Sequence, residues 1–325
     1  MARALITGIA GQDGSYLAEW LLQQGWEVHG VLHAPPQNLW RLQGLESRLA
    51  LHALDLEDPG PVADLVGAIR PDACWHLTGV RTPCPDPASE IRQCSGNVRA
   101  TQILLQALHT SRPGAAFVFA ASSEVFGGSA PAPQSETTPM APGSLYAIAK
   151  AAGVHLVQHY RRERGMRASA ALLFNHESPR RGEAYVTRKV SLAAARIRLG
   201  LQPELRLGDL QAARDWGHAR SYAQAMGAMA ALEAPEDLVL ATGVLHSLED
   251  FVSAAFAALD LDWHRYVVED PSIPRPRREG ILRGDPSRAQ AILGWHDPVP
   301  FESLAKEMAE ADLARLRDHG KGRPA

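Results

Sequence analysis

Residues 4–17, Ala-Leu-Ile-Thr-Gly-Ile-Ala-Gly-Gln-Asp-Gly-Ser-Tyr-Leu, decide the fold of this chain. A short apolar run ends at Gly8, and Gly11 and Gly14 follow with GxxGxxG spacing before a helix predicted over residues 15–24. Glycines at this spacing let the backbone turn tightly, bring N–H groups close to a pyrophosphate and pack the helix against the strand. The segment therefore predicts a dinucleotide-binding strand–loop–helix unit, with the pyrophosphate at the start of the helix.

Alternating strand-like and helix-like segments continue from this unit to residue 174. Strands are predicted at residues 3–7, 27–32, 51–54, 73–77, 116–120 and 168–174, and helices at 15–24, 61–69, 90–110 and 144–164. Such alternation implies right-handed crossovers and a parallel sheet that is covered by helices on both faces.

The rhythm changes after residue 174. We predict a helix at 191–200, a returning strand at 238–242, a helix from residue 248, a last helix at 301–316 and a disordered polar tail at 318–325. The fold class expected is α/β: a Rossmann-type doubly wound parallel sheet with a smaller, interleaved substrate-binding lobe. Residues 1–174 would form the dinucleotide-binding domain, with returning segments near 209–243, and residues 175–325 would mostly form the substrate-binding lobe.

Composition excludes several functional classes. The chain has 325 residues, of which 33 are Lys or Arg and 36 are Asp or Glu, so its net charge of −3 disfavours nucleic-acid or cationic membrane binding. No apolar stretch approaches the ~18 residues of a membrane span, and the N-terminus shows no signal pattern. Cys74, Cys84 and Cys94 fit no zinc-ligand spacing. We therefore expect a soluble cytoplasmic protein without a metal site.

The segments after the second and third strands concern the adenosine end of a dinucleotide. Asp55 and Leu56 follow the third strand, where a carboxylate can accept a hydrogen bond from the adenine amino group. The alternative for Asp55 is a helix N-cap. At His33 the second strand ends without an acidic residue for a ribose 2′-hydroxyl and without an arginine for a 2′-phosphate, although Arg41 and Arg48 can reach back. The residues alone leave NAD and NADP open.

A second motif carries reaction chemistry. Tyr146 and Lys150 form a YxxxK pair, which places the ammonium one helical turn from the phenol. A nearby cation and an oxidised nicotinamide both favour the phenolate, which can then act as a base near neutral pH. Ser122 and Glu124 follow the fifth strand, at the sheet edge where such enzymes bind ligands. A hydroxyl there can bind a reacting oxygen, and a carboxylate can remove a carbon-bound proton; the alternative for Glu124 is a surface charge.

Residues 175–182 read Asn-His-Glu-Ser-Pro-Arg-Arg-Gly, a string far more restrictive than GxxGxxG or YxxxK. With these motifs the chain resembles the extended short-chain dehydrogenase/reductase superfamily and, within it, the GDP-mannose 4,6-dehydratase family. The resemblance runs from residue 4 to about residue 312. Further strings that carry it lie at residues 4–8, 11–17, 186–189, 207–210, 214–219, 241–243, 284–287 and 293–295.

The resemblance implies a lyase that converts GDP-mannose to GDP-4-keto-6-deoxymannose. Tyr146, helped by Lys150 and Ser122, would take the proton of the sugar 4-hydroxyl while a hydride passes from C4 to the nicotinamide. The 4-ketone acidifies the proton at C5, and Glu124 would remove it as a general base. Water then leaves from C6, to which the stored hydride returns, so that the net redox change is zero.

The same resemblance implies the cofactor, the binding residues and the assembly. The cofactor expected is NADP, with NAD as the alternative. Arg180 and Arg181 belong to a loop that in this family meets the cofactor of a neighbouring subunit, which implies a homo-oligomer, either a dimer or a tetramer. The implied cofactor-binding residues are Gly8, Gly11, Gln12, Asp13, Gly14, Arg41, Asp55, Leu56, Tyr146, Lys150 and His176, and the implied nucleotide-sugar residues are Asn175, Lys189, Arg214 and Arg275.

Some segments depart from the family pattern. Residues 78–83 read Thr-Gly-Val-Arg-Thr-Pro where the family usually has Ala-Ala-Gln-Ser-His-Val. His33 and Ala34 replace an Arg-Arg pair, Ser122 stands for a threonine, and Ser221 stands for an aspartate. Three alternatives therefore stay open: a dehydratase of another nucleotide sugar, a 4-keto-sugar reductase or epimerase, and a non-catalytic dinucleotide-binding protein.

Overall fold

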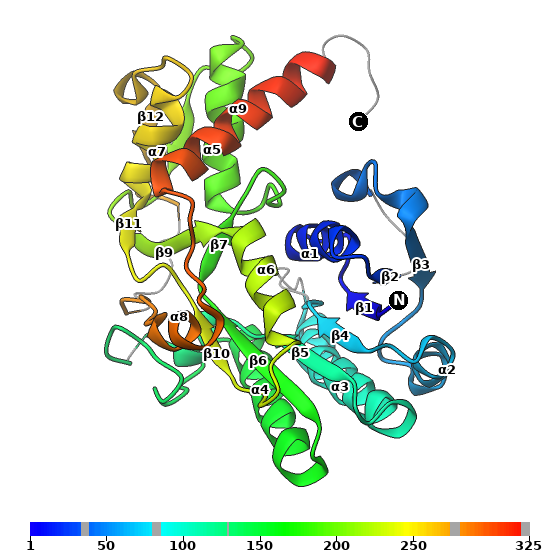
Figure 1. Ribbon diagram of the computed structural model, residues 1–325. Coiled ribbons are helices and arrows are strands. Elements are labelled where there is room, and N and C mark those ends of the chain that lie inside the picture. Colours follow the sequence, from blue (N-terminus) through cyan, green and yellow to red (C-terminus); the bar gives the residue numbers. More distant parts are fainter. Residues whose placement is uncertain (34–38, 80–85, 129, 274–279, 320–325) are drawn as a thin grey trace.

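The computed structural model describes residues 1–33, 39–79, 86–128, 130–273 and 280–319. A large parallel sheet with helices on both faces lies beside a smaller lobe, and the last helix packs in that smaller lobe (Figure 1). The α/β fold class predicted from the sequence is confirmed.

The large sheet has seven strands in the order β10-β6-β5-β4-β1-β2-β3, and every neighbouring pair is parallel. The order reverses between β1 and β4, and in doubly wound sheets ligands bind beyond the carboxyl ends of the strands at such a point. The strands are β1 (Arg3–Thr7), β2 (Glu27–Leu32), β3 (Leu49–Ala53), β4 (Ala73–His76), β5 (Ala116–Ala120), β6 (Arg167–Leu173) and β10 (Leu238–Leu240).

Both faces of this sheet are covered, which explains why its central strands are continuous apolar runs. Strand β5, Ala-Phe-Val-Phe-Ala, is buried at all five positions. One face carries α2 (Pro59–Ile69), α3 (Pro87–Ser111) and α4 (Leu145–Arg164), and the other carries α1 (Gln12–Gln23), α6 (Ala219–Met229) and α8 (Ser287–Leu293).

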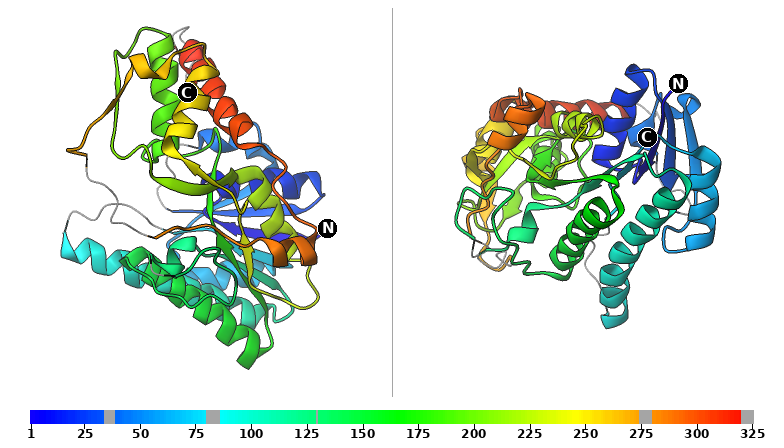
Figure 2. Two further views of the ribbon diagram at one scale, coloured as in Figure 1. Left: turned by 90° about the vertical axis from the view of Figure 1, so that its left-hand side faces the viewer. Right: turned by 60° about the horizontal axis from the view of Figure 1, so that its bottom comes forward.

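The smaller lobe has its own core. Aromatic side chains of Trp216, Phe251 and Phe301 pack together there, with their ring centroids about 6 Å apart. Two small sheets, β7-β9-β11 and β8-β12, accompany three helices beside the large sheet (Figure 2). The elements are α5 (Val186–Arg198), α7 (Leu248–Ala257), α9 (Phe301–His319), β7 (Asn175–Glu177), β8 (Leu205–Leu207), β9 (Ala213–His218), β11 (Leu245–Ser247) and β12 (Val267–Glu269).

The chain passes between the two lobes more than once. Strand β9 belongs to a small sheet, but α6 and β10, which follow it, pack on the large sheet. This return corresponds to the segment near residues 209–243. The domain bounds given above, residues 1–174 and 175–325, stay a prediction.

Several predicted boundaries were wrong. Helix α1 begins at Gln12, three residues early, because Gly11 is its N-cap, so the glycine loop leads directly into the first turn. Helix α5 begins at Val186 rather than at residue 191. Helix α9 extends to His319 and thus includes the start of the predicted tail, whose residues 320–325 lie outside the described ranges.

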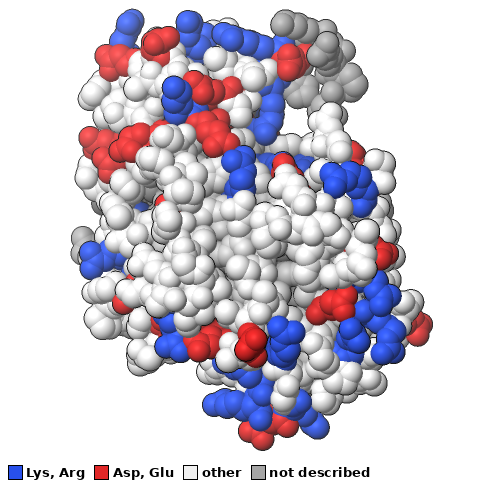
Figure 3. Space-filling model, viewed as in Figure 1, with Lys and Arg blue, Asp and Glu red and all other residues white. Residues whose placement is uncertain are grey.

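The surface and the interior of the described residues add three findings. On the face shown in Figure 3, basic and acidic side chains are mixed at both ends of the molecule, with a broad uncharged area between them. None of the helices placed by the structure is long and apolar enough to cross a membrane. Within those same ranges, no group of three or more His, Cys, Asp or Glu residues is arranged to hold a metal ion.

Candidate active site

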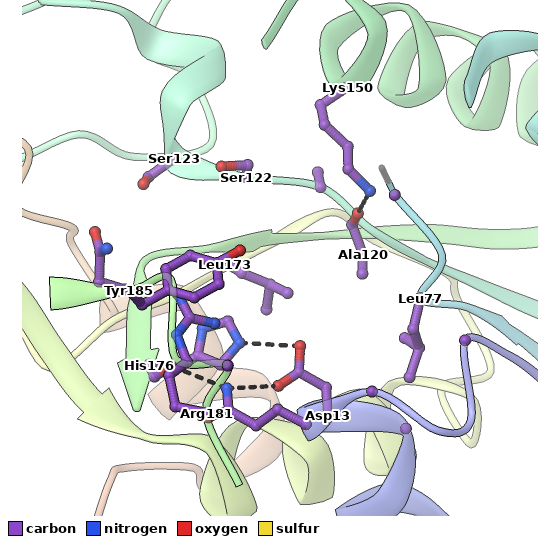
Figure 4. Close-up of a pocket in the computed structure, with 18 of the residues that line it drawn as sticks. Asp13, Leu77, Ala120, Ser122, Ser123, Lys150, Leu173, His176, Arg181 and Tyr185 are labelled. Carbon is purple, nitrogen blue, oxygen red and sulfur yellow. Dashed lines mark hydrogen bonds and ion pairs between the residues drawn. The ribbon is translucent and has the colours of Figure 1, made fainter. Parts of the chain in front are cut away.

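A cavity of ≈ 310 Å³ lies at the carboxyl edge of the large sheet, where the smaller lobe approaches it. Its walls come from the glycine loop, the end of β5, the start of α4, the segment that follows β6, and Arg41. The side chains labelled in Figure 4 converge on this space from both lobes. The lining residues are Gly8, Gly11, Gln12, Asp13, Gly14, Arg41, Leu77, Gly79, Ala120, Ala121, Ser122, Ser123, Glu124, Tyr146, Lys150, Leu173, Phe174, Asn175, His176, Arg181, Gly182 and Tyr185.

The four predicted catalytic residues all line this cavity. Ser122 is the N-cap of a short 3-10 helix (Ser123–Phe126), and its Oγ accepts the N–H of Glu124 at 3.3 Å. Tyr146 lies in the first turn of α4, and Lys150 follows one turn later. The Lys150 Nζ is 5.9 Å from the centroid of the Tyr146 ring. Residues separated in sequence are thus brought to one wall.

Lys150 is a buried cation. Its Nζ donates a hydrogen bond to the Ala120 carbonyl at 2.7 Å (Figure 4) and lies 4.8 Å from the centroid of the Phe119 ring. Burial lowers the pKa of Lys150 to about 8, although the Asp13 carboxylate opposes this shift. A Cβ at Gly79 would lie 2.9 Å from Nζ, so the absence of a side chain there leaves room for the ammonium.

The glycine loop fits the close approach of a phosphate. Gly8 has a φ of +74°, and a Cβ at Gly14 would lie only 2.3 Å from the Gly8 carbonyl oxygen. Helix α1 has no side-chain cap at Gly11, so its first N–H groups face the cavity edge without a competing hydroxyl or carboxylate at that position. A helix start of this kind is a site for anionic oxygen atoms.

Asp13 and His176 form a buried ion pair between the two lobes (Figure 4). The His176 Nδ1 is 2.7 Å from the Phe174 carbonyl oxygen, and its Nε2 is 3.1 Å from Asp13 Oδ2. Because both partners are acceptors, both ring nitrogens donate and the imidazole is protonated. Burial lowers the pKa of His176, but the Asp13 charge outweighs it, and the pKa is raised overall. Conversely, the pKa of Asp13 falls to about 2 despite the opposing effect of burial.

Gln12 joins the same network. Its Nε2 donates to Asp13 Oδ1 and to the His176 carbonyl, both at 3.1 Å, and its Oε1 accepts the Ser178 hydroxyl at 2.8 Å. The glycine loop is therefore connected directly to β7 and the segment after it.

A second cavity, of ≈ 300 Å³, begins on the other side of the glycine loop, and Gly8 and Gly11 line both cavities. Asp55 and Leu56 lie in its wall. Helix α2 is capped by Asp58, which accepts the N–H of Gly60 at 3.2 Å, so the N-cap alternative for Asp55 is wrong.

Of the four residues expected to bind the nucleotide sugar, the structure describes Asn175, Lys189 and Arg214. Asn175 lines the first cavity. Lys189 is exposed and donates to the Arg206 carbonyl at 2.8 Å, and Arg214 on β9 donates to the Ala213 carbonyl at 2.8 Å; neither lines the first or the second cavity. Arg275, like residues 80–83 of the divergent segment, lies outside the described residues.

Two further residues of this wall are Tyr185, which the sequence analysis did not name, and Arg181, which it assigned to the cofactor of a neighbouring subunit. The Arg181 guanidinium stacks 3.5 Å from the centroid of the Tyr185 ring, and its Nε is 2.9 Å from Glu177. Its neighbour Arg180 instead turns to α1, where it pairs with Glu19 at 2.8 Å. The Asn-His-Glu-Ser-Pro-Arg-Arg-Gly string was the available signal, but it directed both arginines to a neighbouring subunit, a contact that stays a prediction.

Comparison with known proteins agrees with these motifs. A family profile described as "GDP-mannose 4,6 dehydratase" matches residues 5–308. The chain belongs to the GDP-mannose 4,6-dehydratase family. "GDP-mannose 4,6 dehydratase 2" of Arabidopsis thaliana is 42% identical over 328 residues, which cover 95% of this chain and 86% of that protein.

A bacterial relative and a solved structure are also similar to this chain. "GDP-mannose 4,6-dehydratase" of Sinorhizobium fredii is 37% identical and covers 97% of both chains. The solved structure of Thermus thermophilus UDP-glucose 4-epimerase, a complex with NAD, has a TM-score of 0.81 and 25% identity, covering 95% of this chain and 98% of that chain. The family resemblance seen in the sequence is thereby confirmed.

Proposed function

We propose that the protein is a nucleotide-sugar 4,6-dehydratase that converts GDP-mannose to GDP-4-keto-6-deoxymannose. The observation that carries this proposal is the single cavity that contains Ser122, Glu124, Tyr146 and Lys150 next to the glycine loop. A dinucleotide-binding protein without activity needs no carboxylate and phenol at one wall, whereas proton removal at two sugar positions needs both.

The residues divide the chemistry as follows. A bound nicotinamide dinucleotide would supply the hydride acceptor that later returns the hydride. Tyr146 removes the proton of the 4-hydroxyl, and the Lys150 ammonium favours the phenolate that does so. Ser122 orients the 4-oxygen. Glu124 removes the C5 proton and gives it to the C6 hydroxyl, which leaves as water. Tyr146 returns its proton to C5 as the hydride would return to C6, which yields the 4-keto-6-deoxy sugar. The backbone N–H of Glu124 donates to Ser122 Oγ at 3.3 Å, which holds the Ser122 hydroxyl beside the backbone of Glu124.

We propose NADP as the cofactor, with NAD as the alternative. The two cavities that meet at Gly8 and Gly11 fit the two halves of an extended dinucleotide. Arg41 lines the first cavity, and its Nη1 donates to the carbonyl of Ala10, a residue of the second cavity's wall, at 3.4 Å. A cation between the two cavities supports the more anionic cofactor. Titration with each dinucleotide decides the choice, and tighter binding of NAD would exclude NADP as the preferred form.

We also propose that the protein is cytoplasmic and that Asn175, Lys189, Arg214 and Arg275 contribute to nucleotide-sugar binding.

We further propose that the chain forms a homo-oligomer. An apolar groove on α3 and the start of α4, lined by Ile91 and Leu145, supports this assembly, since the Ile91 side chain is 68% exposed. Light scattering after gel filtration measures the molecular mass of the assembly, and a monomer at micromolar concentration would contradict the homo-oligomer.

The substrate is tested with purified protein, NADP⁺ or NAD⁺, and a panel of GDP-, UDP-, CDP- and dTDP-hexoses. We expect mass spectrometry to show the loss of one water from GDP-mannose only. Water loss from another member would change the substrate. No water loss, with reduction of a 4-keto sugar by NADPH, would establish the reductase alternative instead.

The role of Glu124 is tested by Glu124→Gln, which keeps the size of the side chain and removes its basicity. We expect water loss to fall at least 1000-fold, roughly 4 kcal/mol in the barrier, while the Kd for the cofactor changes less than twofold. Deuterium exchange at C5 should disappear in parallel. Unchanged turnover would remove Glu124 from the mechanism.

A further inference from the structure

The segment of residues 178–182, here called the arginine loop, is held by its backbone. The carbonyl oxygens of Pro179 and Arg181 both accept hydrogen bonds from Arg188 Nη1, each at 2.9 Å. The carbonyl oxygen between them, that of Arg180, accepts from Arg41 Nε at 2.6 Å. Three consecutive carbonyls are therefore bound by two guanidinium groups, and the Arg181 side chain lines the cavity.

Arg188 is in turn anchored far along the chain. Its side chain is 5% exposed, and its Nη2 is 2.7 Å from Oδ1 of Asp312, which is 0% exposed and lies on α9. The second oxygen of Asp312 accepts the Ser191 hydroxyl at 2.6 Å, and Arg315 Nη1 is 3.2 Å from Oδ1. The last helix of the smaller lobe is thus connected to the cavity wall through one fully buried carboxylate.

An aromatic ring completes this arrangement. The Arg41 guanidinium lies 4.6 Å and that of Arg315 lies 4.7 Å from the centroid of the Trp40 ring. Trp40 and Arg41 belong to a short helix between β2 and β3 of the large sheet, whereas Arg315 belongs to α9 in the smaller lobe. Both lobes therefore contribute to the support of the arginine loop.

The stability of the fold alone does not require the ion pair of Arg188 and Asp312. A buried ion pair loses much of its Coulomb attraction to desolvation, and an apolar replacement of similar volume is often as stable. An apolar replacement would not, however, orient two carbonyls at once. A guanidinium holds its nitrogens in one fixed plane, so Nη1 can bind both carbonyls while Nη2 pairs with Asp312, which supplies the compensating charge in the buried interior.

We propose that Arg188 and Asp312 are positioning residues, which set the backbone of the arginine loop and thereby place Arg181 against the cofactor and nucleotide sugar. This rests on the proposed function only for the identity of those ligands. Neither residue lines the cavity, so both act through the loop rather than on the reacting atoms.

Two variants and one matched control test the proposal. Asp312→Asn removes the charge that anchors Arg188. Arg188→Lys keeps a cation but loses the planar group in which Nη1 binds both carbonyls while Nη2 binds Asp312. The control is Asp237→Asn, since Asp237 pairs with Arg161 Nη1 at 2.8 Å and Nη2 at 2.9 Å away from both cavities. For each variant we would measure the Tm, the Kd for the cofactor, and the KM and kcat for GDP-mannose.

We expect Asp312→Asn and Arg188→Lys to raise the cofactor Kd or the GDP-mannose KM at least tenfold, with kcat within threefold of wild type. Asp237→Asn should lower the Tm while it leaves Kd and KM within twofold. The proposal is overturned if folded Arg188→Lys keeps both constants within twofold, or if the control raises them as much as the two variants do.

Limited trypsin digestion gives a readout that does not depend on the reaction. Trypsin cleaves at the carbonyls of Arg180 and Arg181, the groups that Arg41 and Arg188 bind. Mass spectrometry of peptides ending at these residues should show cleavage at least tenfold faster in both variants, but not in the control. If wild-type protein dehydrates no sugar, the proposed function fails, and this measurement still decides the positioning role: equal cleavage rates would overturn it.

Discussion

Lys150 and His176 are two buried cations at one cavity, and their pKa values move in opposite directions. Burial dominates at Lys150 and lowers its pKa to about 8. At His176 the adjacent Asp13 carboxylate outweighs burial and raises the pKa. Whether burial or a neighbouring carboxylate has the larger effect therefore decides the direction in which the pKa of each buried base moves.

For Lys150 this predicts a pH limit on activity. Below about pH 8 the ammonium is present and favours the Tyr146 phenolate; above it the charge is lost, so kcat/KM should decline with an apparent pKa near 8. Lys150→Arg should turn over more slowly but lose this decline, because a guanidinium stays charged. The measurement is the pH profile of both proteins, and an identical basic limb in the variant would assign that limb to another group.

For His176 the raised pKa predicts a pH-dependent stability. Its stabilising effect is complete below the unfolded-state pKa of 6.5 and is lost as the pH rises through the higher folded-state pKa. Asp13 behaves oppositely: its contribution is complete above 3.8 and is lost as the pH falls towards about 2. His176→Gln should therefore lower the free energy of unfolding by about 3 kcal/mol at pH 6, and by less at pH 9. Urea denaturation at both values checks this, and a pH-independent difference contradicts it.

At the scale of elements, the junction of the glycine loop with α1 is tightly packed. A Cβ at Gly14 would lie 2.3 Å from the Gly8 oxygen and 2.6 Å from Ile9 Cα, both backbone atoms that cannot move independently. We expect Gly14→Ala to raise the cofactor Kd more than tenfold and to lower the Tm. Gly114→Ala is the control, since a Cβ there meets nothing within 4 Å. Equal effects of both substitutions in calorimetry and titration would count against this account.

The elements that could be predicted from the sequence are those with a local signal. Apolar runs locate the strands of the large sheet, and contiguous motifs locate Tyr146, Lys150 and the glycines. Helix α6 gave no such signal, because most of the residues that it buries are small. At Gly227, for example, where α6 packs on α1, a Cβ would lie 2.3 Å from the Trp20 ring. Three-residue strands such as β8 and β12 are too short for alternation to be recognised.

The residues of the candidate site likewise divide into those with a local sequence signal and those without one. Ser122 and Glu124 could be predicted because they directly follow a strand whose carboxyl end faces the ligand side. The support by Arg188 and Asp312 could not, because the carboxylate lies on the last helix and only folding brings the two groups together. That Arg181 lines the cavity of its own chain also depends on contacts between distant segments.

At the scale of the whole molecule, Asp215 is a connection point between the lobes. This fully buried carboxylate on β9 accepts hydrogen bonds from the N–H and hydroxyl of Thr242, at 2.9 and 2.6 Å, and from the N–H groups of Gly243 and Gly284, at 2.9 and 3.1 Å. Three backbone donors would lose their partner in Asp215→Ala. We expect the free energy of unfolding to fall by about 4 kcal/mol.

Thr242→Val is the comparison for this prediction, because it removes one hydroxyl donor and leaves Asp215 in place. It should cost about 1 kcal/mol. Differential scanning calorimetry should show one shifted transition for each variant, and a second, separate transition in Asp215→Ala would mean that the lobes unfold independently.

The position of β10 in the large sheet has a consequence for how the chain is synthesised. Strand β6 is complete at Leu173, but its outer partner β10 begins only at Leu238, after much of the smaller lobe has been made. During translation the β6 edge therefore stays open for tens of residues, with apolar side chains on both of its faces. An unpaired, apolar edge recruits other chains. Nascent protein stalled before residue 238 should thus be the form most dependent on chaperones.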